Sequence, residues 1–381
     1  MTEARGERRT TPVELLWDLV FAFALTRVTT LLANDLVWAE LGRAMLALAL
    51  MWWAWSAYVW ATNAQDPDAA TFRGVMLLAT ALIFIAGLAL PRAFGSEATL
   101  FAVSYALVRL LHLALYADAA RRGNASLAAI AGFAGTVALG MALLVAGSFA
   151  GGGLRVGLWA AAAAIDYAGP GWLGRRRLRG IQEVAVRHFA ERYSLFVIIC
   201  LGESIVAIGV GATGQPLSAQ TVVVLTLALL VTIGMWWTYF DRFAGTAEER
   251  LAAHSDPVLA AADAYSYLHL LLVAGIIVFA AGARAAFMHP RTTLPTGARL
   301  ALCGGVALYL AGHVGFRLRI AGTIAYAKAV AAVACVAAFA LVGHRAPWVT
   351  IAALTAVLVA LVAWETVAEG ADGAGEGATT P

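Results

Sequence analysis

Charged residues are scarce in this sequence. Of its 381 residues, 13% are charged and 62% are hydrophobic, and the mean hydropathy is +0.80. Soluble proteins carry about 25% charged residues, so a water-soluble fold could not shelter this much apolar surface. The composition therefore excludes an ordinary soluble protein and indicates a membrane protein.

Cysteine is rare, and the sequence motifs of familiar catalytic sites are missing. Cys200, Cys303 and Cys335 form an odd set without CxxC or metal-ligand spacing, and we interpret them as apolar packing residues. The chain has no phosphate-binding loop, no HExxH, no GxSxG and no TVGYG filter, and its histidines lack metal-ligand spacing. We expect no enzyme activity, no catalytic residue, no bound metal and no cofactor.

Long apolar runs occupy most of the chain. A helix of about 20 residues crosses a hydrocarbon layer about 30 Å thick. Twelve such runs lie at residues 12–33, 41–63, 72–90, 98–117, 126–149, 154–170, 189–212, 219–241, 265–287, 297–316, 323–343 and 347–367. We predict an all-α fold, a polytopic membrane helical bundle of about twelve transmembrane helices whose surroundings are the lipid bilayer.

The basic residues of the loops predict the orientation. With the N-terminus inside, sixteen Lys and Arg face the cytoplasm and seven face the other side. Because basic loops stay cytoplasmic, we expect both termini inside a multi-pass protein of the inner (cytoplasmic) membrane. The net charge of +3 then reflects the membrane topology. We interpret the arginine-rich segment 171–180 as an inside loop rather than a lipid or nucleic-acid site. We therefore expect no nucleic-acid partner.

The two halves of the chain resemble each other in order. The tripeptide Met51-Trp52-Trp53 recurs as Met235-Trp236-Trp237, the third and ninth runs align without a gap, and His112 matches His313. Six helices per copy make the two copies parallel. We predict a first six-helix repeat at residues 1–180, a second at 181–368, and a disordered C-terminal tail at 369–381, which is acidic and rich in glycine.

Two acids near the start of the first run are candidate binding groups. Glu14 and Asp18 are spaced i, i+4, so they share one helical face and could bind a cation or share a proton. Alternatively, Glu14 caps a helix that opens with Pro12. Both readings remain open at this point.

The seventh run holds the deepest acid of the sequence. Glu203, flanked by Ser204, lies near the middle of the membrane, where a carboxylate costs roughly 2.5–3.5 kcal/mol. Closer to the inner end, Glu191 and Arg192 form an ionic cluster with His188. Glu191 is then an inner-mouth acid and Glu203 is either an ion-binding group or one side of a hydrogen bond between helices.

The fourth run places a cation inside the membrane. Arg109 and His112 are spaced i, i+3, and the arginine requires a partner, for which Asp18, Glu191 and Glu203 are candidates. The pair is either purely structural or part of a gate or proton relay. Asp166 ends the short sixth run before a Gly/Pro break, which either exposes backbone carbonyls to a cavity or simply stops the helix.

Two segments resemble a known family. Residues 11–26, which contain Glu14 and Asp18, and residues 188–209, which contain Glu191, Arg192 and Glu203, look like the two signatures of the bacterial low-temperature-requirement A family. The resemblance covers nearly the whole chain in length and helix order. It implies a polytopic bacterial inner-membrane protein.

Residues 16–26 also show a fainter similarity, to the first-helix motif of the lysosomal potassium channel family. That family has Phe-Ser-Asp where this chain has Leu16-Trp17-Asp18, and the second repeat has Leu195 at the position equivalent to Asp18. The resemblance implies two six-helix repeats in a chain and an ion pore gated by an apolar constriction.

The sequence thus favours transport of a small solute or cation, with carboxylates at the interface between repeats. Asp18 and Glu203 are the predicted binding or proton-coupling acids, and Arg109, His112 and Arg192 their charge partners. The alternatives are a non-transporting scaffold, sensor or stress-adaptation factor, and a cation channel. A homo-oligomer is compatible with each of them.

Overall fold

The structure is a computed structural model that describes residues 10–34, 36–63, 65–66, 68–173, 185–214, 216–241, 243–288, 293–343 and 345–376. These residues form helices and no strand, so the prediction of an all-helical fold is confirmed. The arginines at 175–179, predicted to lie in an inside loop, fall outside the described residues.

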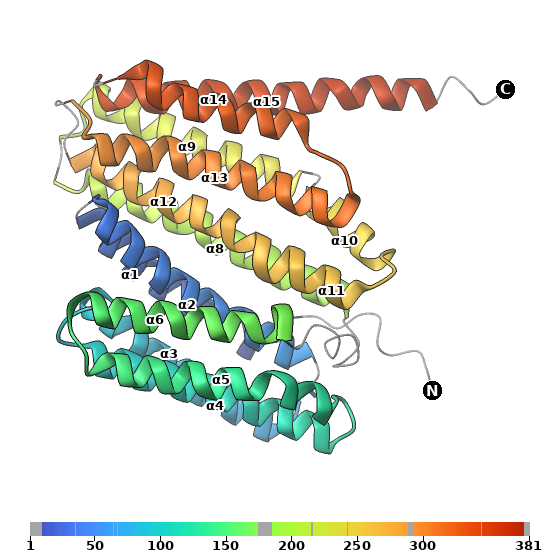
Figure 1. Ribbon diagram of the computed structural model, residues 1–381. Helices are drawn as coiled ribbons and strands as arrows, with labels where there is room; N and C mark the ends of the chain where they lie inside the picture. Colours follow the sequence, from blue (N-terminus) through green and yellow to red (C-terminus); the bar gives the residue numbers. More distant parts are fainter. Residues whose placement is uncertain are drawn as a thin grey trace. The chain divides into compact units, whose positions relative to one another are not determined.

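Within the part of the chain that the structure describes, twelve long helices follow the predicted runs. Figure 1 labels each of them. The first six are α1 (Pro12–Asn34), α2 (Trp38–Asn63), α3 (Ala70–Ala89), α4 (Ala98–Arg121), α5 (Leu127–Ser148) and α6 (Gly152–Ala168). The second six are α8 (Val186–Ala212), α9 (Ala219–Phe240), α12 (His269–Met288), α13 (Thr296–Ala321), α14 (Tyr326–Val342) and α15 (Pro347–Glu376). Among the described residues, ten segments are long and apolar enough to cross a membrane, while α6 and α14, with 17 residues each, are shorter.

Shorter elements join or extend these helices. They are the 3₁₀ turn η1 (Leu90–Arg92), α10 (Phe243–Ala252), α11 (Pro257–Ala261), and the π-helical turns η2 (Gly169–Leu173) and η3 (Ala262–Leu268). Because Pro170 has no N–H to donate, α6 cannot continue as a regular α-helix. The Gly/Pro segment after Asp166 is therefore not a plain helix stop, since the helix widens into η2 instead.

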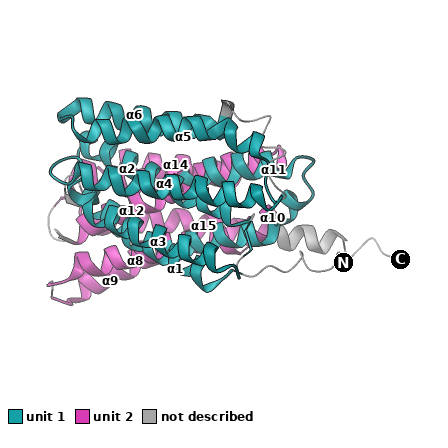
Figure 2. Cartoon of the chain, turned by 90° about the horizontal axis from the view of Figure 1, so that it is seen from below, with its two compact units in different colours: residues 1–199, 248–270 teal, residues 200–247, 271–381 magenta. Residues whose placement is uncertain are grey.

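The chain forms two compact units, coloured separately in Figure 2. The first comprises residues 1–199 and 248–270, and the second comprises residues 200–247 and 271–381. The division between the units falls within α8, and helix α15 continues to Glu376. The predicted limits of the two repeats and of the tail stay predictions.

In the first unit, α5 packs between α4 and α6, α3 packs on α1 and α4, and α2 packs on α1, α4 and α6. Small residues allow the close approach of α5 and α6: a Cβ at Gly147 would lie 2.9 Å from Cδ1 of Trp159. Membrane helices lack a hydrophobic driving force between them, so this close packing is what holds the unit together.

In the second unit, α14 packs on α13 and α15, and α15 also packs on α9 and α13. A Cβ at Gly305 of α13 would lie 2.5 Å from the backbone nitrogen of Phe279 in α12. The fourth, fifth and sixth helices of each predicted repeat are neighbours in sequence order in both units, and the second lies against the sixth. Two copies of one six-helix fold would have this order, and the repeat relationship itself stays a prediction.

Large apolar side chains lie on outward faces. On α3, Leu77, Leu78 and Leu88 are about half exposed, and on α14, Val330 and Val333 are each 69% exposed. Apolar faces of this kind are unfavourable in water and suited to hydrocarbon, where helices satisfy their own backbone hydrogen bonds. The packing therefore agrees with the composition in placing these helices in lipid.

Candidate functional site

A buried cluster of acids and bases joins α1 to the first part of α8. The Arg192 guanidinium makes two ion pairs: Nη1 lies 3.1 Å from Glu14 Oε1, and Nη2 lies 2.7 Å from Asp18 Oδ1. The side chains of all three residues are at most 2% exposed. Since an isolated charge is costly inside a membrane protein, this pairing makes the acids tolerable there.

Neighbouring groups complete the cluster. The backbone N–H and the hydroxyl of Thr11 both donate to Glu14 Oε2 at 2.9 Å, and His188 Nε2 lies 3.5 Å from the same oxygen. Trp55 Nε1 donates to Asp18 Oδ1 at 2.8 Å. Glu14 therefore caps its helix and forms an ion pair at the same time, so the two readings of this residue are not exclusive.

Glu191 takes no part in this contact. It is exposed, whereas Arg192 and His188 on the same helix are buried and turn toward α1. One residue rotates a helix by about 100°, so Glu191 faces away from its neighbour. The ionic cluster expected around Glu191 is thus built from acids of α1 instead.

A second buried ion pair links α4 to α6. Arg109 donates from Nε to Asp166 Oδ2 at 3.0 Å and from Nη2 to Asp166 Oδ1 at 2.7 Å. Both side chains are at most 3% exposed. The sequence reasoning named Asp18, Glu191 and Glu203 as candidate partners of Arg109. The structure corrects that choice to Asp166, and Asp18 pairs with Arg192.

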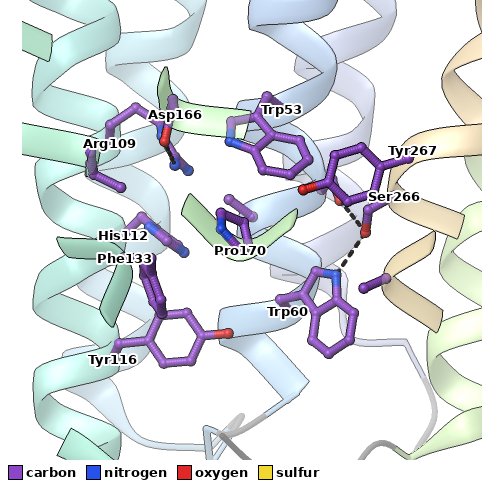
Figure 3. Close-up of a pocket in the computed structure, with 14 residues that line it drawn as sticks. Trp53, Trp60, Arg109, His112, Tyr116, Phe133, Asp166, Pro170, Ser266 and Tyr267 are labelled. Atoms are coloured by element: carbon purple, nitrogen blue, oxygen red, sulfur yellow. Dashed lines mark hydrogen bonds and ion pairs between the residues drawn. The ribbon is translucent and has the colours of Figure 1, made fainter. Parts of the chain in front are cut away.

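The Arg109–Asp166 pair borders a cavity of about 60 Å³ inside the first unit (Figure 3). Side chains of α2, α4, α5 and α6 form its walls together with both π-helical turns, η2 and η3. Such turns are rare and often occur at functional sites. Its lining comprises Trp53, Ser56, Ala57, Trp60, Arg109, His112, Tyr116, Phe133, Val137, Asp166, Pro170, Ala262, Ser266 and Tyr267.

Three nitrogens of the lining have no hydrogen-bond partner among the described residues. They are Nη1 of Arg109, Nδ1 of His112 and Nε1 of Trp53. Each of these side chains is at least nine-tenths buried. Buried polar groups are normally paired, and an unpaired one costs about 1–3 kcal/mol, so the three mark a place where a ligand or water would be stabilised.

The opposite wall is fully engaged in hydrogen bonds. Ser266 Oγ accepts from Trp60 Nε1 at 2.8 Å and from Ser56 Oγ at 3.0 Å, and it lies 3.0 Å from the hydroxyl of Tyr193. The backbone oxygen of Ser266 accepts from Trp52 Nε1 at 2.7 Å. This network fixes η3 against α2 and leaves the other wall, with Arg109, to supply the polar contacts.

Comparison with known proteins gives a family for the chain. Residues 9–363 match the family described as Bacterial low temperature requirement A protein (LtrA). The chain belongs to this family. An uncharacterized protein of Rhizobium meliloti (strain 1021) is 32% identical over 364 residues, which are 93% of this chain and 88% of that protein. No solved structure matches the chain.

Family and structure together confirm part of the expectations. The LtrA resemblance is confirmed, and with its long apolar helices this chain is an integral, multi-pass membrane protein. The two segments that carried the resemblance also meet in the structure, because residues 11–26 supply Glu14 and Asp18 while residues 188–209 supply His188 and Arg192 to one cluster.

The remaining predicted site residues of this LtrA protein lie elsewhere. Glu203 is 5% exposed and Ser204 is fully buried, on the part of α8 that belongs to the second unit, and neither lines the cavity. Among the described residues, no group of His, Cys, Asp or Glu could hold a metal ion. Trp53 and Ser266 were not among the predicted site residues, although the repeated Met-Trp-Trp tripeptide contains the first of them.

Proposed function

We propose that this LtrA protein carries a small solute across the membrane and that the cavity in the first unit is its solute-binding site. The observation that carries the proposal is the set of nitrogens on Arg109, His112 and Trp53 that lack a partner among the described residues, because these three side chains line a cavity within an integral membrane bundle. Polar groups inside a membrane protein usually mark a substrate path. The proposal includes no catalytic step.

The two π-helical turns favour a carrier mechanism rather than a fixed pore. Both η2 and η3 contribute residues to the cavity wall, and irregular helical turns beside a binding site are a feature of transporters with alternating access. A small change in either turn would move Pro170 or Ser266 and alter the cavity. In this mechanism, one repeat rocks on the other around the bound solute.

The acids take different roles in this proposal. Glu14 and Asp18 fasten α1 to α8 through Arg192, whereas Asp166 holds Arg109 in position beside the cavity. Glu203 and Ser204 remain candidates for binding a coupling ion. The exposed Glu191 is a candidate for attracting such an ion to the protein surface. We place the protein in the bacterial inner membrane with both termini cytoplasmic, on the distribution of its basic residues.

One observation favours cation movement as a second candidate function. Glu203 is a buried acid in the middle of a membrane helix, a position that ion-coupled proteins use. A cation channel, similar to the lysosomal potassium channels, would conduct without saturating and would depend on this residue. The non-transporting alternatives, a scaffold, sensor or stress-adaptation factor, need neither Glu203 nor the cavity.

Reconstitution in lipid vesicles distinguishes these functions. Lumenal pH and potassium dyes would be followed under imposed gradients, alongside uptake of labelled small solutes, for wild type, Glu203→Gln and Trp53→Phe. We expect saturable solute uptake that Trp53→Phe reduces. Potassium flux abolished by Glu203→Gln would favour the channel, and the absence of any flux from folded protein would favour the non-transporting role.

A further inference from the structure

We infer that the cavity in the first unit binds a short-chain monocarboxylate. This inference rests on the proposed function in one respect, that the cavity is the solute-binding site. Among the described residues, the lining has nitrogens without a hydrogen-bond partner and no carboxylate oxygen without one. Arg109 Nη1, His112 Nδ1 and Trp53 Nε1 are the nitrogens that lack a partner among the described residues, and both Asp166 oxygens already accept from Arg109.

The geometry of the ion pair determines where an acceptor would bind. Arg109 uses its Nε and Nη2 edge for Asp166, which leaves Nη1 with its N–H groups for another oxygen. Figure 3 shows Trp53, His112 and the Arg109–Asp166 pair around the same cavity. A carboxylate has two oxygens that accept hydrogen bonds, which matches in chemistry the N–H groups of Nη1 and of the Trp53 indole.

Charge restricts the solute further. Among the described residues of the lining, Asp166 carries the carboxylate, and its pairing with Arg109 leaves the described lining without net charge. A cation would meet the unpaired face of Arg109 and find no free carboxylate, so it is disfavoured. Phosphate or a dicarboxylate would bring more negative charge and more oxygens than these donors can satisfy.

The remaining lining residues favour a ligand with an apolar portion. Ala57, Phe133, Val137 and Ala262 present hydrocarbon to the cavity. A halide ion would leave this part without a contact, whereas an aliphatic tail fills it. At about 60 Å³ the cavity is well below the roughly 150 Å³ that accommodates benzene, so it suits a tail of one or two carbons.

Calorimetric titration of the full chain in lipid nanodiscs tests this assignment. The probes are acetate and propionate, with methylammonium, potassium, chloride and phosphate as competitors of other chemistry. We expect acetate and propionate to bind with saturation and the other four to bind at least tenfold more weakly. Tighter binding of chloride, or of either cation, would overturn the carboxylate class.

Matched tryptophan variants locate the binding. Trp53→Phe removes an indole N–H that has no protein partner and keeps an aromatic ring beside Tyr167, whose ring it stacks on at 3.9 Å. Loss of a hydrogen bond to a charged group predicts about tenfold weaker acetate binding. The control is Trp237→Phe on α9, whose side chain is 42% exposed and outside the lining.

Four outcomes bear on the inference separately from the proposed function. Weakened acetate binding in Trp53→Phe, with Trp237→Phe and the melting temperature unchanged, supports the site and the class. Equal binding in both variants rejects this site. Acetate binding without carboxylate flux in vesicles keeps the ligand class and rejects transport, whereas flux of another solute with no acetate binding rejects the class alone.

Discussion

The Arg109–Asp166 pair gives the sharpest prediction about stability. Asp166→Asn keeps the shape of the side chain and removes its charge, which leaves Arg109 without a counter-ion between α4 and α6. The guanidinium makes two hydrogen bonds to this carboxylate, and both side chains are at most 3% exposed. Breaking a buried pair in this way costs about 3–5 kcal/mol.

The assay is reversible unfolding of the full chain by SDS in mixed micelles. The matched control is Asp118→Asn, which breaks the i, i+4 pair between Asp118 on α4 and Arg122, the residue that caps the end of α4. These two side chains are 38% and 41% exposed. An exposed pair contributes about 0–1 kcal/mol. The two substitutions are chemically identical, so a difference between them reports burial.

A double variant completes the test. Arg109→Met with Asp166→Leu removes both charges and supplies apolar atoms, and it should restore most of the stability lost in Asp166→Asn. It should also abolish acetate binding, because Nη1 is gone. A loss below about 1 kcal/mol in Asp166→Asn, equal to that of Asp118→Asn, would contradict a buried, mutually dependent Arg109–Asp166 pair.

Three further predictions concern packing and the other ion pairs. Arg192→Met should destabilise the protein by more than Asp18→Asn, because it leaves two buried acids without their cation. Equal losses below about 1 kcal/mol in the same SDS titration would contradict the burial of this cluster. Gly305→Ala should lower the free energy of unfolding by about 1–3 kcal/mol, because its Cβ would lie 2.5 Å from a backbone atom of α12. The control Gly304→Ala meets no backbone atom and should be neutral or stabilising. Equal melting temperatures of the two variants would contradict the α12–α13 contact. Lys328→Met should lower the free energy of unfolding by about 1–3 kcal/mol, because the Thr238 carbonyl loses the donor Nζ that lies 2.8 Å away. No loss of stability would show that water replaces this donor.

The helices could be predicted from the sequence because their signal is local. A run of about 20 apolar residues has one stable form in lipid, so all twelve predicted runs correspond to helices. The π-helical turn after α6 was less predictable, since Gly169 and Pro170 indicate that a regular helix ends but do not specify the conformation of the next residues.

The pairing of charges could not be predicted, because it depends on contacts distant in sequence. Arg109 and Asp166 are 57 positions apart, and nothing in their spacing indicates that α4 and α6 bring them together. Sequence equivalence also misleads here: Glu14 and Glu191 occupy matching positions of the predicted repeats, yet Glu14 is fully buried and Glu191 is exposed. Burial is decided by which face each helix packs, and a repeat pattern does not specify that face.

The central claim is that a small solute crosses the membrane by way of the cavity beside Arg109. The most direct measurement is uptake of fluoroacetate into reconstituted vesicles at mildly alkaline pH, followed by fluorine NMR, since this stronger acid stays ionised and crosses bare lipid slowly. We expect saturable uptake above that of protein-free vesicles, reduced by Trp53→Phe and unchanged by Trp237→Phe. Uptake equal to protein-free vesicles, or equal in both variants, would contradict it.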